Sequence, residues 1–105
     1  MALKDSYNFE HLINEAETLI LDELERQLNL YSKPMCKCNE CVNDMAAMSL
    51  NSVKPLYRVS LLGSLYTASA MDQKSYANSI REAVLRAIEK IRKNPSHELN
   101  QGIDQ

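Results

Sequence analysis

All three cysteines of the chain lie within six consecutive residues, as Cys36, Cys38 and Cys41 in the spacing C-x-C-x-x-C. Three clustered thiols cannot pair completely into internal disulfides, whereas three thiolates at one point suit a tetrahedral zinc ion that needs one further ligand. We therefore predict a zinc knot at residues 36–41. Two alternatives stay open: a redox-active dithiol at the start of a helix, and reduced core cysteines without a metal.

The fourth zinc ligand is expected from the far end of the chain. A helix over residues 39–52, a connector and a descending helix of about 30 residues would return His97 to the level of Cys36. The other histidine, His11, lies about 20 residues before the end of the first expected helix, roughly 30 Å away at helical rise. His97 is the predicted ligand, and a ligand from a second subunit or a water molecule are the alternatives.

Length and composition favour one small helical domain. The chain has 105 residues, two Gly, three Pro and 45% hydrophobic residues, which is typical of a compact all-α fold. We expect a single domain over residues 1–93 and a polar tail over residues 94–105 that carries the histidine. No stretch approaches the ~20 apolar residues of a membrane span or opens the chain as a signal peptide, so a cytoplasmic protein with reduced thiols is expected. The net charge of −2 argues against a general nucleic-acid coat.

Apolar residues at three- and four-residue steps predict a long first helix. Asn8 is its expected N-cap, and its end is expected near Leu30 to Ser32, before Lys33-Pro34. The predicted apolar stripe consists of Phe9, Leu12, Ile13, Ala16, Leu19, Ile20, Leu24 and Leu28.

A short second helix is predicted to grow out of the cysteine cluster, with Asn39 as its N-cap. Its expected buried face consists of Val42, Met45, Ala46 and Ser49, widened by Met48 and Leu50. After Lys54-Pro55 the chain is expected to form a short extended or irregular connector over residues 56–62.

A long third helical region is predicted from Ser64 to about Lys93, as one helix or as two that meet at Met71-Asp72. The strongest periodicity comes from Tyr76, Ile80, Ala83, Val84, Ala87, Ile88 and Ile91. On the outer face, Glu82 with Arg86 and Glu89 with Lys93 are expected to form pairs four residues apart.

The apolar surface of this region is broader than one small core requires. Leu85 lies off the main stripe, and we count Leu85 and Ile88 as surplus apolar positions. Surplus apolar surface on a long helix favours packing against a second copy. The sequence therefore predicts a homodimer through the third helical region.

Five short motifs follow one another along the chain. They are C-x-C-x-x-C-x-x-D from Cys36 to Asp44, the run Ala46-Ala47-Met48-Ser49-Leu50-Asn51, Pro55-x-Tyr57, Gly63-x-x-Tyr66 and Pro95-x-His97. The combination resembles the late competence development protein ComFB family, and the resemblance extends from Leu12 to His97. That resemblance implies a small helical, zinc-containing homodimer without catalytic machinery. It also implies a receptor for cyclic dinucleotides, cyclic di-GMP in particular.

The residues themselves give little support for an enzyme. The chain has no Gly-rich phosphate loop and no nucleophile with a recognisable base, so we expect no catalytic activity. A catalytic zinc with water as its fourth ligand is the remaining enzymatic alternative, although three thiolates make the metal a poor Lewis acid.

Two non-enzymatic hypotheses follow. A receptor for a twofold dinucleotide, cyclic di-GMP or alternatively cyclic di-AMP, needs guanidinium or amide groups for phosphates and guanine edges, and an aromatic plane. The candidate ligand-binding residues are Asn51, Lys54, Tyr57, Arg58, Arg81 and Arg86. The competing hypothesis is an adaptor with a structural zinc, which docks an unidentified downstream protein through an apolar face.

Overall fold

The computed structural model describes residues 2–59 and 73–95. The expected bend at Met71-Asp72 and the predicted ligand His97 lie outside these residues. In chain order the elements are α1 (Leu3–Ser6), β1 (Ile13–Asn14), α2 (Glu15–Leu30), α3 (Asn39–Asn51), β2 (Tyr57–Arg58) and α5 (Gln73–Lys93). The predicted all-α fold is thus confirmed, with one small addition: β1 and β2 pair antiparallel, Ile13 opposite Arg58 and Asn14 opposite Tyr57.

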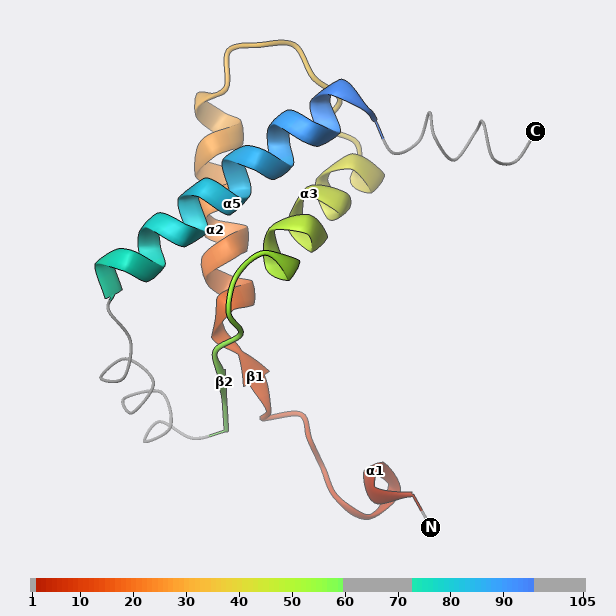
Figure 1. The fold of residues 1–105 in the computed structure, drawn as a ribbon. Helices are drawn as coiled ribbons and strands as arrows, with labels where there is room; N and C mark the ends of the chain where they lie inside the picture. The colour runs from red at the N-terminus through yellow and green to blue at the C-terminus, as the bar shows by residue number, and fades with distance from the viewer. Residues whose placement is uncertain (1, 60–72, 96–105) are drawn as a thin grey trace, which may run out of the picture.

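The core lies where α2, α3 and α5 meet. Figure 1 shows α5 running antiparallel to α3, with α2 packed across both. Every residue of the predicted α5 stripe is buried, which confirms the periodicity argument, and α2 and α3 complete the core with Ala16, Ile20, Leu24, Cys41, Met45 and Ser49. The one buried polar side chain among these, Ser49, donates a hydrogen bond to the carbonyl of Met45 at 2.7 Å, so its burial leaves no unpaired hydroxyl.

The first long helix begins later than its apolar spacing predicts. Asn8 is not its N-cap: α2 starts at Glu15, and the Asn14 side chain caps it by accepting from the N–H of Ala16 at 3.1 Å. The same oxygen accepts from the N–H of Leu56 at 2.8 Å, and the N–H of Glu15 donates to the carbonyl of Leu56. Pairing with the connector therefore holds residues 13 and 14 extended. The end of α2 at Leu30 agrees with the prediction.

Residues 2–12 form an arm that precedes the packed domain. Three large residues that the prediction assigned to the first helix or its start are exposed here: Phe9 by 46%, Leu12 by 47% and the neighbouring Ile13 by 38%. Asn8 does accept a hydrogen bond, from the N–H of Glu10 at 2.9 Å, but it organises a local turn instead of a helix. Figure 1 shows the arm, with α1 near its tip, leading away from the three long helices.

The second helix starts where predicted but with a different cap. Cys38, not Asn39, is the N-cap, and Asn39 is the first helical residue. The predicted buried face is confirmed in its centre, Met45 and Ser49, while Val42 and Ala46 are half-buried. The expected extended connector is confirmed at Tyr57 and Arg58, which form β2.

Two expectations for the surface of α5 are wrong. Ile88 is fully buried in the core of the subunit, so it is not surplus, and only Leu85, 49% exposed, remains of the apolar surface that motivated the dimer. Glu82 does pair with Arg86 at 3.9 Å. Glu89, however, pairs with Arg92 three residues away at 2.9 Å instead of with Lys93, and it also accepts a hydrogen bond from Tyr31, which follows α2.

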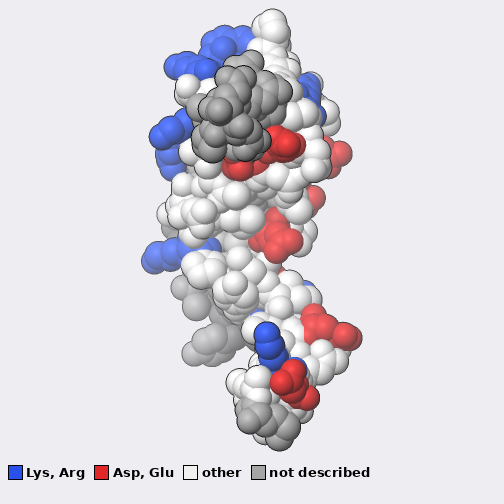
Figure 2. Space-filling view, turned by 90° about the vertical axis from the view of Figure 1, so that its right-hand side faces the viewer, with Lys and Arg blue, Asp and Glu red and all other residues white. Residues whose placement is uncertain are grey.

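Charge is unevenly divided among the three long helices. α5 carries six basic residues against two acidic ones, α2 carries five acidic residues against one basic residue, and α3 carries two acidic residues and no basic one. Figure 2 shows Lys and Arg mainly along one edge of the molecule and Asp and Glu mainly along the other. An acidic chain thus concentrates its cations on one helix. Among the helices of residues 2–59 and 73–95, none is long and apolar enough to cross a membrane.

Candidate metal centre and ligand groove

The three cysteines converge at the start of α3. Their sulfur atoms all lie within 4.8 Å of one another, with Cys41 buried and Cys36 and Cys38 half-buried. A tetrahedral zinc with Zn–S bonds of about 2.3 Å places its sulfur ligands roughly 3.8 Å apart, which these side chains reach by small rotations. An all-thiol set also matches the preference of zinc for soft ligands. The cluster therefore fits a zinc ion, with Cys36, Cys38 and Cys41 as ligands.

The first turn of α3 fixes two of these thiols relative to each other. The sulfur of Cys38 accepts a hydrogen bond from the N–H of Cys41 at 3.4 Å, and the carbonyl of Cys38 accepts from the N–H of Val42 at 3.0 Å. An N–H group that points at a sulfur, together with the positive end of a helix dipole, stabilises a thiolate. The spacing C-x-x-C thus follows from a helical turn that has a cysteine as its cap.

The loop that carries Cys36 is tied to the helices by side chains. The hydroxyl of Tyr31 donates to Glu89 of α5, Arg92 donates to the same carboxylate at 2.9 Å, and Lys37 donates to the carbonyl of Leu28 at 3.2 Å. The hydrogen bond from Tyr31, followed by that from Arg92, lowers the pKa of Glu89 from 4.5 to about 2. Glu89 is consequently ionised throughout the neutral range.

Among the described residues, the one histidine, His11, does not join the thiol cluster. His11 lies in the arm, its side chain 76% exposed and 3.7 Å from Glu10. The 16 residues of α2, a rise of roughly 24 Å, separate the arm from the knot. No further His, Cys, Asp or Glu joins the thiol cluster in residues 2–59 and 73–95. Figure 1 shows α5 ending close to the start of α3, and the predicted ligand His97 follows α5 outside the described residues.

The predicted ligand-binding residues do not form one site within a subunit. Arg58 forms an ion pair with Glu15, while Tyr57 is 60% exposed. Arg81 lies beside Gln27 of α2, whose amide donates to the Arg81 carbonyl at 3.0 Å. Because twelve residues of α2 separate the contacts of the two arginines, these lie roughly 18 Å apart along that helix. Three other candidates, Asn51, Lys54 and Arg86, are exposed.

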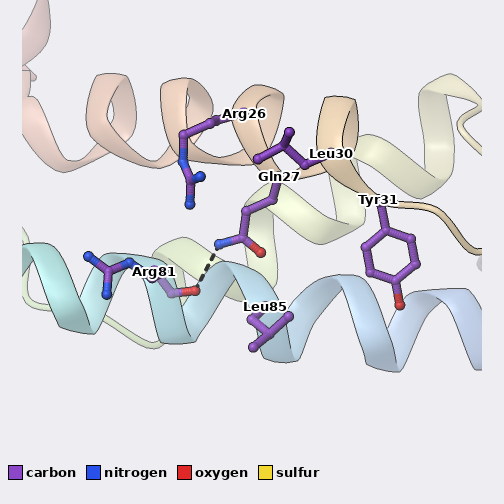
Figure 3. A pocket seen from close by; sticks show the side chains of 6 residues that line it. All are labelled: Arg26, Gln27, Leu30, Tyr31, Arg81 and Leu85. Carbon is purple, nitrogen blue, oxygen red and sulfur yellow. Dashed lines mark hydrogen bonds between the residues drawn. The ribbon is translucent and has the colours of Figure 1, made fainter.

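A shallow groove of about 290 Å³ does gather side chains of the required kinds between α2 and α5. It is lined by Arg26, Gln27, Leu30, Tyr31, Arg81 and Leu85. Figure 3 shows Arg26 and Arg81 at one end, the Gln27 amide bridging the two helices, and Leu85 and Tyr31 toward the other end. Sequence reasoning found Arg81 but missed Arg26, which reads locally as an ordinary surface residue of an amphipathic helix.

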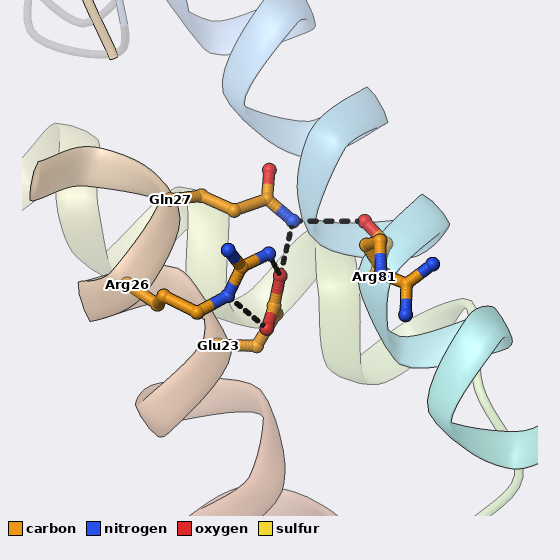
Figure 4. Close-up of polar contacts among 4 residues, drawn as sticks. All are labelled: Glu23, Arg26, Gln27 and Arg81. Atoms are coloured by element: carbon orange, nitrogen blue, oxygen red, sulfur yellow. Dashed lines mark hydrogen bonds and ion pairs between the residues drawn. The ribbon is translucent and has the colours of Figure 1, made fainter. Parts of the chain in front are cut away.

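The polar end of the groove is held in place by Glu23. Its carboxylate accepts from Arg26 at 2.9 and 2.6 Å and from the amide of Gln27 at 2.7 Å (Figure 4). The hydrogen bond from Arg26 is the largest influence on Glu23 and lowers the pKa of the carboxyl group. The guanidinium of Arg81 forms no ion pair with any residue in the described ranges. One cation is therefore fixed by a carboxylate and the other is available.

Comparison with known proteins agrees with the helical architecture. A family model described as late competence development protein ComFB matches residues 13–95. Among solved structures, the late competence protein ComFB from Bacillus subtilis is similar, with 26% sequence identity and a TM-score of 0.64 over 81% of this chain and 92% of that one. No curated protein matches significantly. The family match begins at Ile13, where the packed domain begins, and leaves out the arm.

Proposed function

The chain belongs to the late competence development protein ComFB family, and from this premise we propose a non-enzymatic, zinc-stabilised regulatory protein that binds a cyclic dinucleotide as a homodimer. Cyclic di-GMP is the proposed ligand and cyclic di-AMP the alternative. The choice of a cyclic dinucleotide rests on the family resemblance. The proposed metal and the proposed anion contacts rest on the thiol cluster and the basic residues of this chain.

The position of the thiol cluster supports a structural zinc. Cys41 belongs to the hydrophobic core, and Cys36 and Cys38 pack against it. A zinc ion there would link the loop after α2 to the start of α3. Such a cross-link would add stability that a small domain cannot obtain from buried apolar area alone. Metal analysis of protein prepared without chelator should give about one zinc per chain. Protein that folds without any bound metal would rule out this part of the proposal.

The concentration of cations on α5 is the observation that carries the receptor function. A dianionic ligand requires fixed cations, and in a chain of net charge −2 these must be gathered locally. Five of the six basic residues of α5 are exposed, and two of these, Arg81 and Arg86, are the proposed contacts for the phosphates. Tyr57 and Arg58 remain proposed contributors, as do Asn51 and Lys54, and a second subunit would be needed to bring them near Arg81.

Calorimetric titration tests the receptor function directly. Purified zinc-loaded protein is titrated with cyclic di-GMP and, separately, with cyclic di-AMP, while light scattering gives the mass of the species. We expect binding at micromolar concentrations and a mass of about twice the 12.0 kDa chain. Absence of heat with both dinucleotides well above micromolar concentration rejects the receptor, and a mass of one chain rejects the dimer.

An adaptor remains the second candidate because one specific surface favours it. Leu30 is 71% exposed and Leu85 49% exposed on the two sides of the same groove. Contiguous exposed apolar patches mark protein-docking surfaces, and these two leucines would lie at the centre of such a patch. If neither dinucleotide binds, we propose that a downstream protein covers Leu30 and Leu85.

A further inference from the structure

The groove between α2 and α5 has a polar end and an apolar end. The two guanidinium groups of Arg26 and Arg81 occupy the polar end, and Leu30, Leu85 and the ring of Tyr31 line the rest (Figure 3). A nucleotide has the same division, with a charged phosphate at one end and a flat, largely apolar base at the other. Base recognition commonly uses apolar or aromatic faces for stacking and an amide for the base edge.

The two arginines differ in a way that suits phosphate binding. Glu23 holds Arg26 through the Nε group and one terminal nitrogen, which leaves the remaining N–H donors of that guanidinium free. Because Glu23 fixes Arg26, little side-chain freedom is lost when an anion binds. The backbone of Arg81 is held beside α2 by a hydrogen bond to its carbonyl from Gln27, which lies 54 residues before it and next to Arg26.

From this geometry we infer that the α2–α5 groove is the site of the proposed ligand, with a phosphate of the cyclic dinucleotide between Arg26 and Arg81 and one base over Leu30 and Leu85. This assignment rests on the proposed receptor function. It selects Arg81 over Arg86, which forms an ion pair with Glu82 and lies outside the groove. It also adds Arg26 and, as a positioning residue, Glu23.

The size and charge of the groove agree with one nucleotide unit. Its volume of about 290 Å³ is at the lower end of the range of about 300–1,000 Å³ that is usual for small-molecule sites. The carboxylate of Glu23 would repel a phosphate if it were unpaired, but both of its oxygens accept hydrogen bonds from Arg26 or Gln27. With Arg26 and Glu23 compensating each other, Arg81 gives this end of the groove a net positive charge.

The test compares substitutions that each remove one positive charge from the same protein. Arg26→Ala, Arg81→Ala and Lys90→Ala are each titrated with cyclic di-GMP by calorimetry in the dimer or monomer that the chain forms. We expect Kd to rise about 10- to 100-fold for Arg26→Ala and Arg81→Ala, the usual effect of a lost charge-assisted hydrogen bond. Lys90→Ala removes the same charge from an exposed site on the same helix that does not line the groove, and it should change Kd by less than about threefold. Melting curves and zinc content confirm that each variant is folded.

The outcomes separate this inference from the function on which it rests. If wild-type protein binds cyclic di-GMP and both groove variants bind equally well, the groove is wrong and the receptor function stands. Equal weakening by all three substitutions also overturns the site, because it indicates a general effect of charge. If wild-type protein binds neither cyclic di-GMP nor cyclic di-AMP, the receptor function itself fails. A Glu23→Gln variant that retains wild-type affinity would remove only the positioning role.

Discussion

The two ends of α2 are held by different means. At its carboxyl end, Tyr31 contacts Glu89 of α5, and the chain continues into the thiol cluster, part of which is buried. At its amino end, one side chain, Asn14, binds both the first turn and the connector, and beyond it the arm exposes its apolar residues. The carboxyl end thus leads into the proposed zinc site, whereas the amino end is held by hydrogen bonds to the connector and by the ion pair of Glu15 with Arg58. Stability should therefore be concentrated at the knot.

The largest effect is expected from loss of the metal. Cys38→Ser keeps a good N-cap for α3, because serine caps helices well, but removes one zinc ligand. We expect zinc content to fall and the free energy of unfolding to drop by at least about 4 kcal/mol, a fall in Tm of more than about 15 °C. Thermal melts with metal analysis measure this, and a strong chelator should reproduce the effect in wild-type protein. A Cys38→Ser variant that melts with the wild type would show that the knot does not stabilise this end.

A smaller effect is expected at the other end of α2. Asn14→Ala removes the cap of Ala16 and leaves the N–H of Leu56 without its acceptor. We expect a loss of about 2 kcal/mol, or a fall in Tm of about 8 °C, measured by thermal or urea unfolding. The matched control is Asn8→Ala, since Asn8 accepts only a local hydrogen bond in the exposed arm. Its effect should be below about 0.5 kcal/mol, and equal losses from the two substitutions would contradict the comparison.

The carboxyl end of α2 should also respond to acid. The pKa of Glu89 is about 2 in the folded protein and 4.5 ordinarily. In acid, the folded protein therefore binds fewer protons at this carboxylate than the unfolded chain does. Its contribution to stability is fully present above about pH 4.5 and is lost as pH falls toward 2. Between pH 6 and pH 3, Tm should fall more for the wild type than for Glu89→Gln. Tyr31→Phe should behave in between, and identical pH profiles for all three proteins would refute the contribution of this contact.

The smallest effect is expected from the arm. Removal of residues 2–11 deletes exposed side chains and keeps Asn14 and both strands, so the free energy of unfolding should change by less than about 0.5 kcal/mol. Urea unfolding of the shortened chain measures this. A loss of more than about 2 kcal/mol would mean that the apolar residues of the arm are covered in solution, and light scattering of both proteins would show whether a second copy covers them.

The sequence predicted the features that depend on local spacing. The buried stripe of α5 repeats at helical intervals over about four turns, and the cysteine spacing is that of a helical turn, so both could be read directly. The start of α2 could not, because Phe9 and Leu12 continue the apolar spacing without being buried. The start of the helix at Asn14 is set by a partner, Leu56, that lies 42 residues away.

Long-range contacts also explain the two errors on α5 and the missed arginine. The carboxylate of Glu89 is shared between Arg92 of the same helix and Tyr31, which follows α2. Ile88 appeared surplus because periodicity does not tell how many helices cover a given face. Arg26 is recognisable as a candidate ligand contact only when α5 brings Arg81 close to it. Arg81 lies 54 residues along the chain from Gln27, the neighbour of Arg26. In each case the outcome depends on a contact with a part of the chain that is distant in the sequence.

The separation of charge between α5 and the other two long helices affects how salt acts on this molecule. Two packed layers of helices are about 20 Å thick, whereas the Debye length at physiological ionic strength is about 8 Å. An anion next to α5 is therefore screened from most of the acid on α2 and α3. In dilute buffer the same anion experiences the whole molecule, whose net charge is −2. Moderate salt weakens both the repulsion from the acidic residues of α2 and α3 and the attraction to the basic residues of α5. The net field that guides an anion to α5 therefore varies less with ionic strength than it would on a uniformly basic protein.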